Sequence, residues 1–355
     1  MPYSIEQKVF GLTKEAVRGT AEAAVGRFIP VDRATELDYK LNLIEDEQLR
    51  GMFDRLSPQS GTKEGAGTLT GIDVQSDNVG EIFHSLLGSV VSTDVGEVGG
   101  AYKHVFSRAA GISLPSYTVF ASRGISAQAY PLSIVKSIAL NGTMDGKAKL
   151  DASILFKNEV ATSATFAPVW DEPIPFMFFQ TEVKIAGGIS ADVRSYSLSI
   201  DNQSLGLRSL NNSQDVRDII APGKLLANGT FEIYFETEAE RAKFLANTAS
   251  SFEINLVGSV IETGQNHRLK IALPKIHYTA FPYGELDGLL GAAVAFNAYY
   301  TAGVSPAGTK IPTGCTCGTF TWKMTPASAL SRPRNGTRAG RTSCTVESPR
   351  LCWMR

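Results

Sequence analysis

Residues 193–200 read VRSYSLSI, and this stretch decides the fold because apolar and polar residues alternate along it. Tyr196, Leu198 and Ile200 share one face of an extended chain, and the serines between them share the other. A period of two predicts a β-strand with one buried face. Residues 37–44, which read LDYKLNLI, have a similar pattern, so we expect the same half-buried strand to occur twice.

The rest of the chain repeats this order. Each half is predicted to contain a strand that runs into one amphipathic helix, followed by further strands. The paired stretches are residues 68–74 and 77–87 with 230–235 and 238–249, residues 117–121 with 268–272, and residues 148–156 with 292–300. The even-numbered residues of 148–156 are predicted to share one face. The pattern predicts a duplicated β module with one helix per copy, and two unrelated β-domains are the alternative.

The length of 355 residues favours two cores of about 150 residues each over one small core. The proline-rich residues 161–175 mark the predicted boundary, because proline removes a ladder donor and fixes an extended path. We expect an N-terminal arm at residues 1–36, a first β module at 37–165, a second at 170–303 and a separate segment at 304–355.

The C-terminal segment differs from the rest in charge and composition. Residues 301–355 hold eight lysines and arginines against one acid, Glu347, whereas residues 1–300 hold 26 basic and 34 acidic residues. All the cysteines lie in this segment, at positions Cys315, Cys317, Cys344 and Cys352. Their spacing does not match the paired Cys-X2-Cys motifs of zinc sites. We expect a basic, disordered tail, or an extension translated from a junction or a shifted frame.

The chain has no apolar run of about 18 residues, the length that predicts a membrane-spanning helix. The first residues, MPYSIEQKVFGL, lack the charged, apolar and small-residue regions of a signal peptide. These observations predict a protein that is made and kept in a cytoplasm.

Reactive groups do not converge in the sequence. The histidines are isolated, at His84, His104, His267 and His277, and no nucleophile elbow, P-loop or dinucleotide-binding glycine motif occurs. The acidic clusters 45–47 and 171–172 are interpreted as solvated loop acids. We predict no catalytic, cofactor or metal site. The acidic residues 1–300 also argue against a surface that grips phosphates, although a like-charged wall would keep a polyanion mobile.

A series of short motifs has an order and spacing that point to one family. They are Glu15, Gly19-Thr20, Ile29-Pro30, residues 44–51, 86–88, 102–106, 114–119, 135–140, 146–156, 273–276 and 292–300. Together they resemble the tail tube proteins of long-tailed bacteriophages, in the branch whose chain carries two tube modules. The motifs cover about residues 10–303, and the C-terminal segment matches nothing in that family.

The resemblance implies packed antiparallel sheets, as a sandwich or barrel, with one flanking helix per module. It implies a structural virion protein that stacks as rings into a hollow tube for genome ejection into the host. Two modules per chain predict a trimeric ring with pseudo-sixfold symmetry. The implied partners are further copies of the chain, the tape-measure protein, the tail terminator, the baseplate hub, and double-stranded DNA that passes through without specific binding. The implied locations are the host cytoplasm during assembly and then the virion tail, without cofactor or membrane.

Two long polar stretches, residues 57–67 and 205–223, are predicted to be mobile surface loops at equivalent places in the two modules. By the same resemblance they are candidates for contacts between stacked rings. The candidate residues are Ser57, Gly61, Lys63, Glu64, Gly67, Leu205, Arg208, Asn211, Asp215 and Arg217.

Two alternatives stay open. A baseplate or tail-completion protein built from the same module is one, and a carbohydrate-binding or hydrolytic β-sandwich is the other. Sugar platforms expose aromatic side chains, yet Trp322 and Trp353 lie in the C-terminal segment and only Trp170 lies before it. The second alternative is therefore disfavoured.

Overall fold

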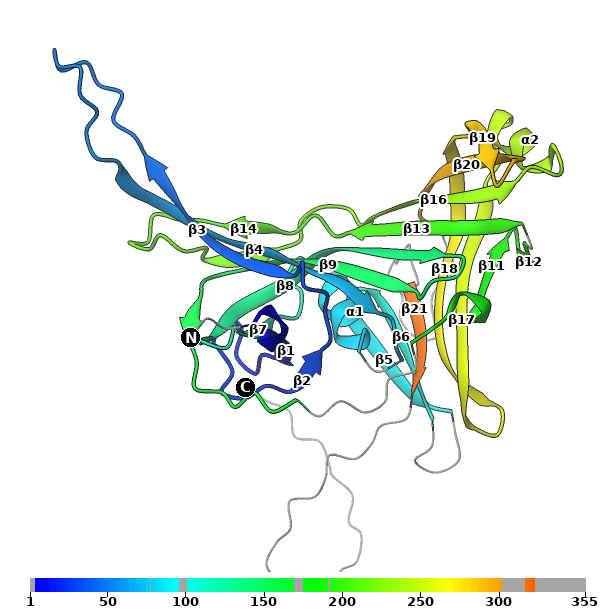
Figure 1. Ribbon diagram of the computed structural model, residues 1–355, viewed down its shortest axis with the longest axis horizontal. Helices are drawn as coiled ribbons and strands as arrows, with labels where there is room; N and C mark the ends of the chain where they lie inside the picture. Colours follow the sequence, from blue (N-terminus) through cyan, green and yellow to red (C-terminus); the bar gives the residue numbers. More distant parts are fainter. Residues whose placement is uncertain are drawn as a thin grey trace, which may run out of the picture. The chain divides into compact units, whose positions relative to one another are not determined.

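The computed structural model describes residues 4–76, 78–95, 101–168, 175–190 and 192–301, and the backbone of residues 317–322. Within these residues the fold is mainly antiparallel β, as predicted (Figure 1). The helical elements among them are α1 (Gly80–Leu87), α2 (Ala239–Leu245) and the short 3-10 turns η1 (Ile5–Gln7) and η2 (Phe178–Gln180). Residues 169–174 of the predicted boundary, which include Trp170, and most of the C-terminal segment lie outside the described residues.

The strands of the first half belong to a large sheet that also contains strands of the second half. They are β1 (Val9–Lys14), β2 (Arg27–Ile29), β3 (Glu36–Ile44), β4 (Gln59–Asp73), β5 (Gly88–Asp94), β6 (Tyr102–Arg108), β7 (Tyr117–Ser122), β8 (Ala127–Thr143), β9 (Lys149–Phe156) and β10 (Val160–Ala161). Strands β3, β4, β9 and β8 pair in that order. The first part of β8 pairs instead with β7, which pairs with β1, and β1 pairs with β2.

The second half follows the same plan. Its strands are β11 (Thr181–Ile185), β12 (Gly188–Ile189), β13 (Val193–Asp201), β14 (Leu205–Leu207), β15 (Asp218–Ile220), β16 (Leu226–Tyr234), β17 (Ser250–Glu262), β18 (Gln265–Ala280), β19 (Tyr283–Leu286) and β20 (Leu289–Ala298). Strands β13, β16, β20 and β18 pair in that order, β18 pairs with β17, β17 with β11, and β11 with β12. The backbone of β21 (Cys317–Trp322) pairs with both β6 and β18.

The strand pairings therefore repeat along the chain. The first half adds the β5–β6 hairpin and the second half adds β14–β15. One predicted correspondence is wrong: residues 117–121 lie in β7, whose counterpart is β17, whereas residues 268–272 lie in β18, the counterpart of β8. The β5–β6 hairpin lies between α1 and β7, whereas β17 follows α2 directly. Matching the strands by their order after each helix therefore paired the wrong strands.

The alternation in β13 and β9 has the predicted consequence. Tyr196, Leu198 and Ile200 are buried, and so are the even-numbered residues of 148–156. Strand β3 differs, because its outer residues, including Leu43 and Ile44, are exposed. The neighbouring sheet ends before them, since no residue of β4 earlier than Gly65 pairs with β9.

Helix α1 packs its apolar face under the sheet. Phe83 and Leu86 are fully buried, and the helix contacts β8, β5 and β6. It ends at Gly88, which adopts a positive φ of 91° and donates its backbone N–H to the carbonyl oxygen of His84. Helix α2 ends at Leu245, four residues earlier than predicted, because Asn247 takes a left-handed conformation just before β17.

A cluster of aromatic rings forms the core of the second half. Phe231 lies 5.4 Å from Phe252 and 5.9 Å from Phe296, measured between ring centroids, and all three side chains are buried. Rings at these separations gain edge and offset contacts beyond the burial of apolar area. Tyr130 and Phe156, 4.7 Å apart, have a similar role in the first half.

One strand pair joins the two halves. The last part of β8 pairs antiparallel with β13, from Ser137 opposite Asp201 to Thr143 opposite Ser195. The sheet therefore continues from β3 through β9 and β8 into β13 and β20. The described residues belong to one compact unit, Met1–Met324.

Candidate assembly surfaces

The β3–β4 hairpin projects beyond the sheet that it enters, as the blue ribbon in Figure 1 shows. The prediction that residues 57–67 form a mobile loop is wrong, because β4 begins at Gln59 and pairs with β3 from there. Backbone pairing needs no buried side chain, so a polar, glycine-rich composition did not reveal it. Glycine is also required: a Cβ at Gly67 would lie 2.5 Å from the carbonyl oxygen of Glu36.

The tip of this hairpin, residues 45–58, exposes large apolar side chains. Leu49 is 102% exposed and Phe53 is 108% exposed, and Met52 and Leu56 are exposed as well. An ion pair of 2.5 Å between Arg50 and Asp46, and another between Arg55 and Glu45, tie the tip to itself. A group of exposed apolar residues of this kind marks an interaction surface. Sequence reasoning missed it, although four apolar residues in an otherwise polar connection were a visible signal.

The second predicted loop, residues 205–223, is not free either. We call it the strap, because it folds as the β14–β15 hairpin and packs against the first half. Its Val216 and Ile219 are buried in a small cluster with Leu114 and Ile134 of the first half. Its polar composition hid these apolar residues, which tertiary contacts bury.

Arg18 joins the strap to the first half through three hydrogen bonds, two to the strap and one to Leu114. Its Nε donates to Oδ1 of Asp218 at 3.0 Å, its Nη1 to the Leu114 carbonyl at 2.5 Å, and its Nη2 to the Ile219 carbonyl at 2.6 Å. Hydrogen bonds from a charged donor are stronger than neutral ones. The strap is thus held by both charge and burial.

The two predicted loops also contact each other. Arg208 Nη2 donates to the Lys63 carbonyl at 2.7 Å and lies 3.4 Å from Glu64 Oε1. The Tyr39 hydroxyl donates to Oδ1 of Asp215, and burial together with this carboxylate raises the pKa of Tyr39. Four of the ten candidate residues, Lys63, Glu64, Arg208 and Asp215, therefore come together within one chain.

The other candidates are distributed differently. Ser57, Leu205, Asn211 and Arg217 are exposed, whereas Gly61 and Gly67 are strand residues of the hairpin. Their contact role between rings stays a prediction. The exposed tip, residues 45–58, is the stronger surface because its apolar side chains have been left in solvent.

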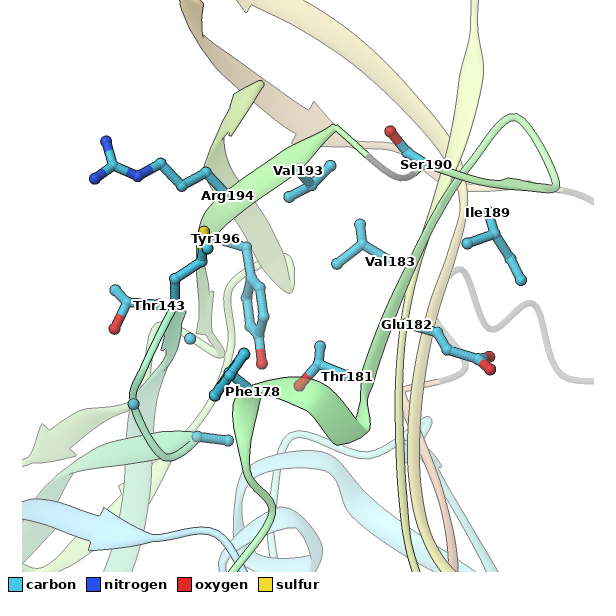
Figure 2. A pocket seen from close by; sticks show the side chains of 14 residues that line it. Thr143, Phe178, Thr181, Glu182, Val183, Ile189, Ser190, Val193, Arg194 and Tyr196 are labelled. Carbon is cyan, nitrogen blue, oxygen red and sulfur yellow. The ribbon is translucent and has the colours of Figure 1, made fainter. Parts of the chain in front are cut away.

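A cavity of about 290 Å³ lies between β11, β12, β13 and the turn after β8. Its charged lining residues, Glu182 and Arg194, point away from the Tyr196 ring in Figure 2. Glu182 instead accepts a hydrogen bond from Asn255, and Arg194 pairs with Asp287 at 2.7 Å. Burial raises the pKa of the Tyr196 phenol. The cavity therefore offers no convergent acid and base for chemistry.

Histidines and acids are dispersed. His84 Nδ1 lies 2.7 Å from the Tyr117 hydroxyl, and burial, with a smaller contribution from Lys14, lowers the pKa of His84 to about 4. Within the described part of the chain, no group of three or more histidines, cysteines and acids is placed to hold a metal ion. No helix in that part has the length and apolar character needed to cross a membrane.

The fold and these surfaces define a structural β-protein whose distinctive features are a projecting apolar hairpin and a repeated sheet. A family model described as phage tail tube protein matches residues 6–298. The chain therefore belongs to the phage tail tube protein family, which confirms the resemblance seen in the motifs. No match to this chain was found among curated proteins.

Membership has three consequences. The chain is a structural protein of the bacteriophage virion, and its place is the tail. The family assembles with itself into a tube. The role of the family is structural.

Proposed function

We propose that this chain polymerises as stacked rings into the tail tube through which the phage genome is ejected into the host. The observation that carries the proposal is the repeated strand plan, joined into one sheet by β8 and β13, in a chain of the tail tube family. If neighbouring chains are joined by a strand pair like the one that joins the two halves, the sheet can continue from chain to chain and close into a ring.

We propose that the two copies of the strand plan are two tube modules, at residues 37–165 and 170–303. The arm at residues 1–36 adds β1 and β2 to the first module, because β1 pairs with β7. Two modules per chain make a ring of three chains with pseudo-sixfold symmetry. A ring has no exposed terminal edge, which removes the aggregation hazard of open sheets.

The stacking contact in this proposal is the tip, residues 45–58. Its exposed side chains, Leu49 and Phe53 above all, would leave water when they meet a copy of the chain in the adjacent ring.

The remaining partners follow from the tube. The tape-measure protein and the DNA would occupy the lumen, and the tail terminator and the baseplate hub would cap the ends. Residues 1–300 carry an excess of acids, 34 against 26 basic residues, which repels a polyanion and suits passage without specific binding. Assembly would take place in the host cytoplasm.

The test removes the apolar tip while keeping the fold. The Leu49→Ser, Phe53→Ser double variant should stay folded by circular dichroism but sediment as rings or smaller species where the unaltered chain forms tubes. The matched control is Ile125→Ser with Val260→Ser, at side chains that are 77% and 66% exposed elsewhere, and it should form normal tubes. Tubes of normal length from the tip variant would remove the tip from the stacking contact, and a control that also fails would show a general solubility effect.

A further inference from the structure

We propose that the ring closes by pairing the outer edge of β3 in one chain with the outer edge of β19 in the next chain. This inference rests on the proposed ring. It identifies the closing surface as a copy, between chains, of the β8–β13 junction that already exists within each chain.

The equivalence of the strands comes from their pairing partners. Leu37 of β3 lies opposite Gly67, as Leu198 of β13 lies opposite Gly229. Strand β3 therefore occupies in the first half the place that β13 occupies in the second. Strand β13 uses its other edge to pair with β8, whereas β3 pairs with β4 alone among the described strands.

Strands β18 and β19 together occupy the place of β8. Ala280 at the end of β18 lies opposite Ala295 of β20, and Tyr283 of β19 lies opposite Ala292, so both strands run along β20 in one register. Strand β9 is the equivalent of β20, and β8 runs along β9 in the same manner. Within the described residues β19 has no second neighbour in the sheet.

The outer edge of β19 is able to accept a strand. Pro282, which has no backbone N–H, points its carbonyl toward β20, where Ala293 donates to it at 3.1 Å. In an antiparallel pair, the backbone N–H and C=O groups of successive residues point alternately toward the partner strand and toward the other edge. The backbone groups of Phe281 and Tyr283 therefore face the free edge, and the missing donor of Pro282 does not interrupt it.

The register follows from the junction inside the chain. Gly67 pairs with Ile154 as Gly229 pairs with Phe296, so Leu150 and Ala292, each four residues earlier in its strand, are equivalent. Because Leu140 pairs with Leu150 and Tyr283 pairs with Ala292, Leu140 and Tyr283 are equivalent positions as well. Since Leu198 lies opposite Leu140 within the chain, Leu37 is expected opposite Tyr283 of the neighbouring chain. The next pair along the strands is then Glu36 opposite Gly284.

Arg123 occupies a backbone acceptor on this edge of β3 in the single chain. Its Nη2 donates to the carbonyl oxygen of Leu37 at 3.0 Å, on the side of β3 that faces away from β4. Arg123 Nη1 also donates to Gln128 at 3.2 Å, so the guanidinium has an alternative partner when a neighbouring strand takes its place. A charged group on an edge is a known device against uncontrolled strand pairing.

The test is a disulfide across the proposed junction. Glu36 and Gly284 are exposed, and a Cβ at Gly284 meets nothing within 4 Å, so Glu36→Cys with Gly284→Cys should fold normally. The carbonyl of Lys136 accepts from the Asn202 N–H at 3.0 Å, which places Asn141, the equivalent of Gly284, in a non-hydrogen-bonded pair. Such pairs have Cα atoms about 4.5 Å apart, within the range of a disulfide.

The variant is made in the full chain with its four native cysteines changed to serine. Mild oxidation of assembled rings should convert most chains to a covalent trimer on non-reducing gels. The matched control, Asp38→Cys with Gly284→Cys, moves one cysteine by two residues on the same face and should remain monomeric. Rings that form without the covalent trimer, or equal cross-linking of the control, would overturn the junction while leaving the ring intact. If the unaltered chain itself forms no rings, both the junction and the proposed function would be overturned.

Discussion

Ile219→Ala is expected to release the strap, residues 205–223, without unfolding the sheets. The Ile219 side chain is 1% exposed and packs in the small cluster that joins the strap to the first half. Shortening a buried isoleucine to alanine costs about 2–4 kcal/mol, because transfer energy is lost and a cavity remains. The main core is a separate cluster, so the loss should act on docking of the strap.

Hydrogen exchange measures this loss directly. The reporters are the Ala221 N–H, which donates to Ile112, and the Arg217 N–H, which donates to Leu207. When opening is fast and reversible, a loss of about 2–4 kcal/mol raises the exchange rate by about 30-fold to 10³-fold. Amides of β9 should exchange as in the unaltered chain.

Leu210→Ala is the matched control, since Leu210 lies on the same strap but is 109% exposed. It should leave the exchange of both reporter amides unchanged. Equal exchange in the two variants would refute docking of the strap by Ile219. Faster exchange throughout β9 in Ile219→Ala would show that the strap and the main core unfold together.

Three further outcomes are expected. Gly229→Ala should lower the melting temperature and the free energy of unfolding, the latter by about 1–3 kcal/mol from overpacking. The reason is that the added Cβ would lie 2.6 Å from a backbone carbonyl oxygen. Gly284→Ala is the control, because a Cβ at that position meets no atom within 4 Å, and it should leave the melting temperature unchanged. The pKa of His84 is about 4 in the fold against 6.5 for a free histidine, so folding favours the neutral ring. The stability that neutral His84 contributes should be fully present above about pH 6.5 and be lost as the pH falls toward 4. The melting temperature of His84→Asn should therefore depend less on pH in this range, and an unchanged pH dependence would contradict the prediction. Arg123→Ala should shorten the lag phase of ring assembly, measured by light scattering, because it frees the carbonyl of Leu37. An unchanged lag phase would show that the hydrogen bond from Arg123 does not slow assembly.

The alternating strands were readable from sequence because one side of each faces a continuous core. In β13 and β9 the burial of every second residue is written directly into the order of residues. Strand β3 shows the limit of this reading. Its alternation of apolar and polar residues continues past Tyr39, yet the later residues are exposed. The reason is that β9, which pairs with β4, ends at Phe156 and does not extend beneath them.

The loops were less readable because their structure depends on distant residues. Residues 59–67 are polar and pair through their backbone, and the strap buries Val216 and Ile219 only because Leu114 and Ile134 meet them from the other half. The exposed tip left a compositional signal in Leu49, Met52, Phe53 and Leu56, but exposure itself is a property of the folded chain. The family resemblance supplied the assembly that composition did not encode. The module boundaries stay a proposal.

We propose that three two-module chains close into a ring and that the rings stack into a tube. Electron microscopy of the purified full-length chain, with symmetry determined from end views and compared with a chain truncated after residue 303, tests it most directly. We expect hollow stacked rings with three chains and six similar lobes per ring. Rings of six chains, or monomers from both proteins at every concentration, would contradict it.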